Sequence, residues 1–574
     1  MNPQAGLSIV RGVPLAEEPG LGALTLPGFL REVCTRYPDR EALVEHRPDG
    51  AVLRWTYAEL WTRAMAVAKS LAAGGLAKDE RVAVLMTNRT EFLSAMFGIG
   101  LAGGVAAPFG TFSTAPEIEY LLRLSACSVL LFEPRVLRKD FAGIVTDIIP
   151  GLEDAEPGAL ASAEFPFLRR VVALDLKSSA GAVERWEDFL ASGAHVSDAA
   201  VEARAATVTP ADPGVLFFSS GSTASPKGVL SAHRAVAIQS WRMARQQALS
   251  DGVRSWTANG FFWSGNFAMV VGATLASGGS IVLQRTFDPA EALRLMAAER
   301  VTFLFAWPHQ WEQLVGVPGF AEADLSALIE LDPEGPIARN RTVHTIWIEP
   351  RHAYGNTETF TLSTGYPAGT TRDEAGDSHG PPLPGNTLRI VDPISGEPVA
   401  IGERGEIAIK GPTLMLGYVG VPIDETFDDQ GFFRTGDGGR IDGCPITGDA
   451  RLVWEGRLSD VIKTGGANVS PLEIDAVLLA CPGVRLSQTV GVPHATLGEL
   501  VVACVVPHEG AALTEAGVRA FARTRLASYK VPRRVLVCAG EDLEMTGSAK
   551  VRTTALRSLA AERIAGRDAT QAPR

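Results

Sequence analysis

The sequence predicts a mainly α/β fold in which one chain forms several domains. Short apolar runs that are typical of strands, at 81–86 and 127–132, alternate with helix-like stretches such as 91–101. This alternation is typical of α/β cores. The chain has 574 residues, which is too long for one compact core, so we expect it to divide into domains.

One uncharged segment, residues 92–116, is long enough to suggest a membrane span. It contains five glycines and Pro108, which are poorly suited to one continuous helix. We therefore expect a buried helix to about Ala102, a turn at Gly103-Gly104 and a short core strand. No integral membrane span is predicted.

Composition and charge exclude several function classes. The chain is 46% hydrophobic and 21% charged with a net charge of −12, so it lacks the basic footprint of a nucleic-acid-binding protein. Its six cysteines are scattered without a Cys-x-x-Cys pair, which favours neither a zinc site nor a disulfide framework. The first residues lack the basic-then-apolar order of a signal peptide, so we expect a cytoplasmic protein, with a homodimer as the candidate oligomeric state.

A stretch rich in hydroxyl groups and glycine follows a strand-like run at 215–218. Within residues 219–228 there are five hydroxyl side chains, two glycines and one lysine. Glycine lets backbone N–H groups turn toward an anion, and hydroxyls add donors. The candidate phosphate-binding residues are Ser219, Ser220, Gly221, Ser222, Thr223 and Lys227.

This stretch is not a Walker loop, because Pro226 and Gly228 flank Lys227 where that motif needs Gly and Ser or Thr. It resembles instead the Ser/Thr/Gly-rich phosphate loop of the adenylate-forming superfamily, which includes acyl-CoA synthetases. Ala224 stands where the family usually has glycine. The resemblance covers about residues 25–558. It implies a large N-terminal domain with α/β sheets and a small barrel-like part, followed by a small mobile α+β lid.

A second motif, Tyr354-Gly355-Asn356-Thr357-Glu358, resembles the family's Tyr-Gly-x-Thr-Glu. Mg²⁺ prefers hard oxygen ligands, commonly one carboxylate with phosphate oxygens. The resemblance gives Glu358 this role, with Ser220 as a second metal contact. It also implies that Thr357 contacts phosphate and that Tyr354 lies beside the base. The family's Gly-Gly-Ala-Pro-like turn, which commonly contacts adenine, is missing from residues 331–342.

Two further motifs resemble the family's ribose site and hinge. Thr435-Gly436-Asp437 matches Thr-Gly-Asp, whose carboxylate accepts the ribose hydroxyls. Arg457 is expected to contact ribose or phosphate through its planar guanidinium. The pivot falls on Ser459, so we predict an N-terminal adenylation domain at 1–458 and a lid domain at 459–574.

In the lid, Ser470 and Glu473 predict a capping box that starts a helix at Pro471. The resemblance implies that Gly465 and Gly466 line a pantetheine channel. It also makes Lys550, in Thr546-Gly547-Ser548-Ala549-Lys550, the mobile lysine of adenylation.

The acid pocket is expected at an aromatic segment after residue 260. Amino-acid-activating relatives usually carry Asp near Phe262, and an ammonium without a counter-charge there would be costly. An apolar acid is therefore favoured, whether fatty, aryl-alkyl or steroid-like. The predicted pocket residues are Phe261, Phe262, Trp263, Gly265 and Trp307.

Together these motifs predict an ATP-dependent acid–CoA ligase that uses Mg²⁺ and forms acyl-AMP before acyl-CoA. Holding two anions together and stabilising charge on phosphorus needs backbone N–H groups, a metal and a lysine, but no covalent enzyme intermediate. Acyl transfer to a carrier protein, luciferase-like oxidation and catalytically silent nucleotide binding remain as alternatives.

Overall fold

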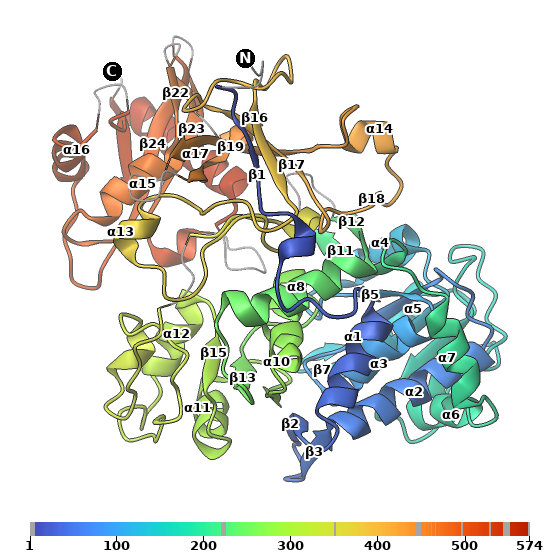
Figure 1. The fold of residues 1–574 in the computed structure, drawn as a ribbon. Coiled ribbons are helices and arrows are strands. Elements are labelled where there is room, and N and C mark those ends of the chain that lie inside the picture. The colour runs from blue at the N-terminus through green and yellow to red at the C-terminus, as the bar shows by residue number, and fades with distance from the viewer. Residues whose placement is uncertain are drawn as a thin grey trace.

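The computed structural model describes residues 6–219, 226–348, 352–443, 449–460, 462–464, 467–494, 497–526, 530–543 and 551–571. Three large sheets, one two-stranded sheet and their helices form the N-terminal part, and a further sheet with three α-helices and a short 3₁₀ helix forms the C-terminal part (Figure 1). The predicted α/β fold with a large N-terminal part and a small C-terminal part is confirmed.

The largest sheet has eight strands and carries the phosphate-loop flanks. In order across the sheet, its strands are β10 (Val183–Arg185), β9 (Arg170–Ala173), β6 (Val129–Phe132), β4 (Arg81–Leu85), β5 (Val105–Pro108), β11 (Pro213–Ser219), β12 (Lys227–Ala232) and β18 (Gly417–Tyr418). The first six run parallel, and β12 and β18 are antiparallel to their neighbours.

Helices cover both faces of this sheet, as the alternation of side chains along β4 requires. Val82 and Val84 pack with helices α1 (Leu26–Arg36), α2 (Tyr57–Ala73) and α3 (Thr90–Leu101). Ala83 and Leu85 pack on the other side with α4 (Ala115–Ser125) and α5 (Phe141–Ile148).

The uncharged segment follows its predicted course. Helix α3 ends at Leu101, Gly103 has a φ of +80° at the turn, and β5 begins at Val105. Every residue of α3 except Glu91 is buried inside the protein. Across the described ranges, no helix is both long and apolar enough to span a membrane.

The second sheet has five strands and is mostly parallel. Across it lie β15 (Phe303–Phe305), β13 (Arg254–Thr257), β14 (Ser280–Leu283), β2 (Glu41–His46) and β3 (Val52–Thr56), of which only β3 is antiparallel to its neighbour. Its associated helices are α8 (His233–Gln246), α9 (Ser264–Asn266), η2 (Phe267–Gly272), α10 (Ala273–Ala276), α11 (Pro289–Ala298) and α12 (Pro308–Val315).

The third sheet is antiparallel and fits the predicted barrel-like part. Its strands are β1 (Ile9–Arg11), β16 (Thr387–Val391), β17 (Gly405–Lys410), β19 (Phe433–Gly443) and β20 (Ala450–Arg457). The remaining short elements of the N-terminal part are η1 (Leu15–Glu17), β7 (Arg135–Val136), β8 (Lys139–Asp140), α6 (Trp186–Ser192), α7 (Asp198–Ala206), η3 (Pro336–Arg339), η4 (Thr357–Thr359), α13 (Arg372–Ala375) and α14 (Ile423–Thr426).

A buried ion pair connects the N-terminal segment to α8. Both Glu18 carboxylate oxygens accept from Arg242, at 2.8 and 2.7 Å, and Arg242 also donates to the Pro384 carbonyl. At the start of the same helix, His233 Nδ1 accepts from Leu26 N at 3.3 Å. Burial lowers the pKa of His233 to about 4, so its ring is neutral at pH 7 and accepts the Leu26 hydrogen bond at the start of the helix.

The C-terminal part begins after η5 (Leu458–Asp460). Its sheet contains β21 (Ile462–Thr464), β22 (Ala467–Val469), β23 (Val484–His494), β24 (Gly498–Pro507) and β25 (Arg534–Val537). The helices are α15 (Pro471–Leu479), α16 (Glu515–Arg523), η6 (Gly540–Asp542) and α17 (Thr553–Gln571). Figure 1 shows this part packed above the α12 region and beside the third sheet.

The predicted capping box at α15 is wrong, although the helix does start at Pro471. Ser470 Oγ makes no cap bond and donates instead to the Glu455 carbonyl on β20 at 3.0 Å. Glu473 accepts from Lys530 Nζ at 2.6 Å. Tertiary partners therefore replace the local ones, and the Ser470 hydroxyl links the start of α15 to β20.

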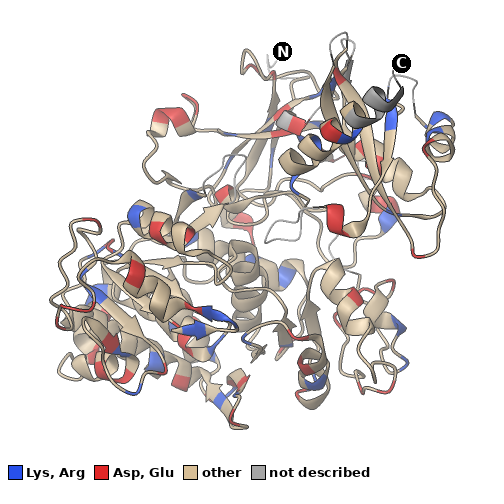
Figure 2. Cartoon of the chain, turned by 180° about the vertical axis from the view of Figure 1, so that it is seen from behind, with Lys and Arg blue, Asp and Glu red and all other residues tan. Residues whose placement is uncertain are grey.

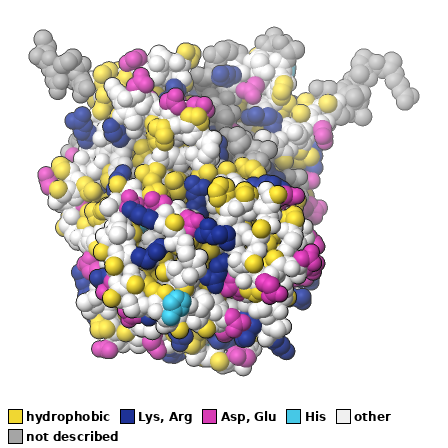
Figure 3. Space-filling view, turned by 90° about the vertical axis from the view of Figure 1, so that its right-hand side faces the viewer, with side chains coloured by type: hydrophobic (Ala, Val, Ile, Leu, Met, Phe, Trp, Pro, Cys, Tyr) yellow, Lys and Arg dark blue, Asp and Glu magenta, His cyan; other side chains and the backbone are white. Residues whose placement is uncertain are grey.

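Residues of both charge signs, Lys and Arg in blue and Asp and Glu in red, are interspersed along the ribbon (Figure 2). On one face, basic side chains gather near the middle, bordered by hydrophobic and acidic ones (Figure 3).

Candidate active site

The phosphate loop lies between two strands that pair directly. Ser219, the last residue of β11, is opposite Lys227, the first residue of β12. Ser219 Oγ is buried and has no hydrogen-bond partner among the described residues. The donor is thus left for a ligand at the start of the loop. The predicted contacts Ser220, Gly221, Ser222 and Thr223 lie outside the described residues.

Glu358 lies in the short helix η4, where a tight turn holds its backbone. Asn356 Oδ1 accepts from Thr359 N at 3.0 Å, and Phe360 and Thr361 have φ of +47° and +85°. Such conformations are costly for residues other than glycine and occur often at functional sites. Met415 N donates to the Glu358 carbonyl at 2.7 Å, so the surrounding structure fixes the turn.

Close backbone packing explains why the motif has a glycine at position 355. A Cβ on Gly355 would lie 1.7 Å from the carbonyl oxygen of Thr361. Only glycine allows the backbone before Glu358 to fold back so closely on the residues after it.

Tyr418 contacts both the carboxylate and the lysine of the site. Its hydroxyl donates to Glu358 Oε1 at 2.7 Å, and Lys227 Nζ lies 4.8 Å from the centre of its ring. Burial, and next the charge of Glu358, raises the pKa of Tyr418, so the hydroxyl stays protonated at neutral pH. The sequence motifs give no indication of this contact, because Tyr418 is 60 residues from Glu358.

Asp437 is the centre of a second cluster. In the pairing of β19 with β20 it lies opposite Arg457, whose Nε is 3.1 Å from Oδ1. Tyr354 donates to Oδ2 at 2.6 Å, and Arg457 Nη1 donates to the Thr435 carbonyl at 2.9 Å. Burial raises the pKa of Asp437, while Arg457 and the Tyr354 hydroxyl counteract it.

Aromatic side chains pack against the Tyr354 ring of this cluster. The Tyr354 and Trp454 ring centres are 6.4 Å apart, and His379 lies edge-on to Trp454 at 5.7 Å. Trp454 N donates to His379 Nδ1 at 3.2 Å. Burial, and next His352, lowers the pKa of His379 to about 4. His379 is therefore neutral at pH 7.

The two clusters belong to one site. Tyr354, which donates to Asp437, lies four residues before Glu358, which accepts from Tyr418. The structure thus brings together Lys227, Glu358, Asp437, Arg457 and Tyr354 from separate motifs. Thr357 lies in the same short helix as Glu358. The roles of these residues in binding and catalysis stay predictions.

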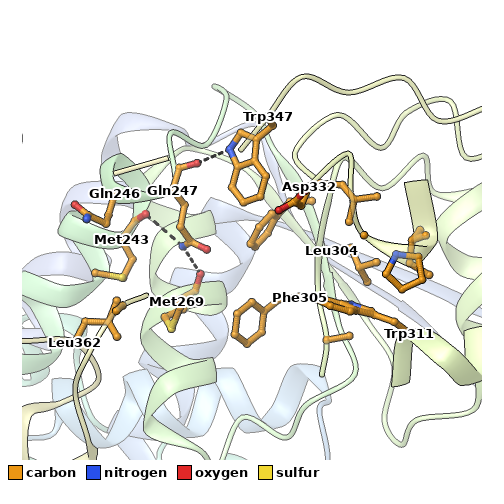
Figure 4. A pocket seen from close by; sticks show the side chains of 17 residues that line it. Met243, Gln246, Gln247, Met269, Leu304, Phe305, Trp311, Asp332, Trp347 and Leu362 are labelled. Carbon is orange, nitrogen blue, oxygen red and sulfur yellow. Dashed lines mark hydrogen bonds between the residues drawn. The ribbon is translucent and has the colours of Figure 1, made fainter. Parts of the chain in front are cut away.

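An apolar pocket, which measures about 750 Å³ when the open solvent within it is counted, is drawn in Figure 4. The C-terminal end of α8, strand β15 and the segment 331–337 form its walls, and Ala353, directly before Tyr354, completes them. Gln247 Nε2 donates to Met269 O at 2.8 Å, and Trp347 Nε1 donates to Gln247 O at 2.9 Å. The segment at which the adenine-contacting turn is missing therefore lines a cavity.

The five predicted pocket residues lie elsewhere, and none of them lines this cavity. Phe261 is buried against Phe92, with ring centres 5.7 Å apart, and Phe262 lies edge-on to Phe112. Trp263 packs on Phe262. Gly265 is part of α9, and Trp307 is 44% exposed beside Phe305.

The remaining predicted residues belong to the hinge and the lid. Ser459 lies within η5, between β20 and β21. Gly465, Gly466 and Lys550 lie outside the described residues. Their roles, like the boundary between 458 and 459, stay predictions.

The site offers one carboxylate, a hard oxygen ligand of the kind that magnesium prefers. One Glu358 oxygen accepts from Tyr418, which leaves the second carboxylate oxygen for a metal. No group of three His, Cys, Asp or Glu within the described ranges could hold a metal. The site thus fits an ion that takes one carboxylate and completes its shell with phosphate oxygens and water, as Mg²⁺ does.

Comparison with known proteins identifies the family. The sequence model described as "AMP-binding enzyme" matches residues 30–419, and that of the "AMP-binding enzyme C-terminal domain" matches residues 473–550. The 3-[(3aS,4S,7aS)-7a-methyl-1,5-dioxo-octahydro-1H-inden-4-yl]propanoyl:CoA ligase of Mycobacterium tuberculosis is 31% identical over 528 residues, 89% of this chain and 94% of that protein.

Two further matches agree. The feruloyl-CoA synthase of an Amycolatopsis species is 31% identical over 502 residues, 86% of this chain and 92% of that protein. The crystal structure of ATP-bound MatB from Rhodopseudomonas palustris superimposes with a TM-score of 0.71 at 26% identity, covering 94% of this chain and 99% of that one. The predicted resemblance is thus confirmed, and the chain belongs to the AMP-binding enzyme family, among acyl-CoA synthetases and CoA ligases.

Proposed function

We propose that this protein is an ATP-dependent acid–CoA ligase that converts an apolar carboxylic acid to acyl-AMP and pyrophosphate, and then to acyl-CoA. The observation that carries the proposal is the meeting of Lys227, Glu358 and the Asp437–Arg457 pair at one site. A lysine beside the phosphate loop, a carboxylate for a metal and a carboxylate for ribose are the groups that ATP requires.

Each described residue then has a task in adenylation. Ser219 Oγ and Lys227 contact the phosphates. Asp437 accepts hydrogen bonds from the two ribose hydroxyls. Glu358 would hold Mg²⁺, which when bound neutralises phosphate charge. The protein thereby holds the acid carboxylate and the α-phosphorus of ATP together and stabilises the added negative charge.

The lid supplies the second half of the reaction in this proposal. Lys550 enters the site during adenylation, and rotation about Ser459 then exchanges it for Gly465 and Gly466. The missing side chains of the two glycines leave room for the pantetheine arm of CoA. Its thiol attacks the acyl-AMP carbonyl carbon, AMP leaves, and a thioester forms. The link from Ser470 to β20 is one contact that such a rotation would break.

The cavity beside Ala353 supports an apolar acid. Met, Leu, Phe and Trp side chains form most of its lining, which suits a hydrocarbon or ring-containing body. Two relatives are named as the ligase of a methyl-dioxo-octahydroindenyl-propanoyl group with CoA and as a feruloyl-CoA synthase, and both of these acyl groups contain rings. An aryl-alkyl or fused-ring acid is therefore our first choice of substrate.

Acid-dependent exchange of labelled pyrophosphate into ATP tests the first half-reaction. A panel of fatty, aryl-alkyl and fused-ring acids should contain some that support exchange, and Glu358→Gln should abolish it while leaving the protein folded. If none of the acids in the panel supports exchange, the protein does not adenylate them, and the proposal fails.

The acceptor needs a separate measurement. With an acid that supports exchange, CoA should produce a thioester whose mass is that of the acyl-CoA. If acyl-AMP accumulates with CoA present and disappears only when a carrier protein is added, the CoA half of the proposal is wrong.

A further inference from the structure

Tyr418 lies between the two opposite charges of the phosphate site. Its hydroxyl is 2.7 Å from Glu358 Oε1, and its ring centre is 4.8 Å from Lys227 Nζ. Within the described part of the chain, no ion pair joins Lys227 to Glu358 directly. Both side chains therefore contact the same tyrosine rather than each other.

The tyrosine is rigidly placed. Its strand β18 pairs with β12, so that Tyr418 is opposite Val229, two residues after Lys227. Phe433 packs edge-on against its ring at 6.2 Å. Three residues earlier, Met415 N bonds to the Glu358 carbonyl. The backbone of this segment is thus attached both to the strand of Lys227 and to the turn of Glu358.

This arrangement has an electrostatic consequence. If Lys227 and Glu358 formed an ion pair, each charge would be compensated before a ligand arrived, and binding would have to break the pair. A neutral hydroxyl occupies one carboxylate oxygen without cancelling its charge, and a ring face holds an ammonium by a weaker cation–π attraction. Both charges are thereby kept available for magnesium and phosphate.

We propose that Tyr418 is a positioning residue for magnesium–ATP, whose hydroxyl orients the Glu358 carboxylate and whose ring holds the Lys227 ammonium apart from it. This inference rests on the proposed function, because it takes Glu358 as the metal carboxylate and Lys227 as a phosphate contact. Tyr418 itself contacts neither the acid nor the phosphorus that reacts.

Two substitutions separate the hydroxyl from the ring. Tyr418→Phe keeps the ring and removes the hydroxyl, whereas Tyr418→Leu removes both. ATP binding is measured by calorimetry without acid or CoA, in EDTA and across a series of Mg²⁺ concentrations, so that the readout does not depend on turnover. Tyr366→Phe is the control, since its hydroxyl bonds to Ser378 at 2.5 Å and contacts neither Glu358 nor Lys227.

For Tyr418→Phe, the Mg²⁺ concentration that gives half-maximal ATP binding should rise about tenfold, the effect of one lost hydrogen bond to a charged group. Its ATP affinity in EDTA should match the wild type. Tyr418→Leu should in addition weaken ATP binding in EDTA about threefold to tenfold, from the lost cation–π contact. Tyr366→Phe should change neither quantity.

A double substitution makes the test independent of a general loss of structure. In a Glu358→Gln background, Tyr418→Phe should no longer alter the Mg²⁺ dependence, because the group that it positions is gone. If Tyr418→Phe and wild type show the same Mg²⁺ dependence, the proposed role of the hydroxyl is wrong. If Tyr418→Leu binds ATP in EDTA as well as Tyr418→Phe does, the proposed role of the ring is wrong.

The result can be told apart from failure of the proposed function. If the Mg²⁺ dependence changes as expected but none of the acids supports pyrophosphate exchange, the role of Tyr418 stands and the proposed ligase activity fails. If the protein exchanges pyrophosphate but shows no effect of Tyr418→Phe, the reverse holds.

Discussion

Tyr354 donates a hydrogen bond of 2.6 Å to Asp437, the carboxylate assigned to ribose. Both side chains are buried, and burial raises the pKa of Asp437. Because the tyrosine hydroxyl stabilises the charged carboxylate, it counteracts that rise. The tyrosine thus keeps Asp437 ionised to lower pH and leaves Oδ1 to be shared between Arg457 and a ribose hydroxyl.

Tyr354→Phe should therefore make ATP use more sensitive to acid. The ionised form of Asp437 is lost as the pH falls through its raised pKa, and without the tyrosine hydroxyl this loss begins at higher pH. We expect kcat/KM for ATP to fall about tenfold at pH 8 and its acidic limb to move to higher pH. A pH profile measures this for wild type, Tyr354→Phe and the control Tyr366→Phe, whose hydroxyl bonds to Ser378 and not to Asp437. An unmoved acidic limb would show that Asp437 is not the titrating group.

Gly355→Ala should disrupt the turn that holds Glu358. The new Cβ would lie 1.7 Å from Thr361 O, so the backbone would have to shift, at a cost of about 1–3 kcal/mol or more. ATP binding measured by calorimetry should weaken, and the Tm should fall. Gly443→Ala is a matched control, because none of the residues that the structure describes lies within 4 Å of its added Cβ. Equal behaviour of the two variants would remove the steric explanation of this glycine.

The buried pair between Glu18 and Arg242 should contribute strongly to stability. Their side chains are 3% and 2% exposed, so Glu18→Gln leaves a guanidinium buried without its counter-charge. We expect a loss of about 3–5 kcal/mol in the free energy of unfolding. Glu119→Gln breaks the Arg123 pair, in which the side chains are 41% and 44% exposed, and should cost less than about 1 kcal/mol. Urea denaturation compares them, and equal losses would contradict the expectation.

Sequence patterns predicted the elements whose residues are close together in the chain. The helix, turn and strand of the uncharged segment follow from local glycines and apolar residues, and β11 was expected at 215–218. The order of the motifs along the chain likewise predicted that Glu358, Asp437 and Arg457 contribute to one ATP site.

Contacts between distant segments could not be predicted in the same way. Ser470 matches a capping box by spacing, but its hydroxyl bonds to β20. Tyr418 and Glu358 meet only because β18 joins the edge of the large sheet. The cavity is lined by residues between Met243 and Leu362, and no local pattern connects them.

The location of the acid gives a last prediction, because the aromatic segment after residue 260 and the cavity are different places. Met269 lines the cavity, so Met269→Trp should fill part of it and reduce kcat/KM for a fused-ring acid about tenfold or more, the loss that follows from about 1–3 kcal/mol of overpacking. Short acids should be affected less, and the KM for ATP should not change. Phe262→Leu instead alters the aromatic segment after residue 260, where the sequence predicts the acid pocket. If only Phe262→Leu changes acid selectivity, the acid binds at that aromatic segment. If Met269→Trp raises the KM for ATP alone, the cavity belongs to the nucleotide.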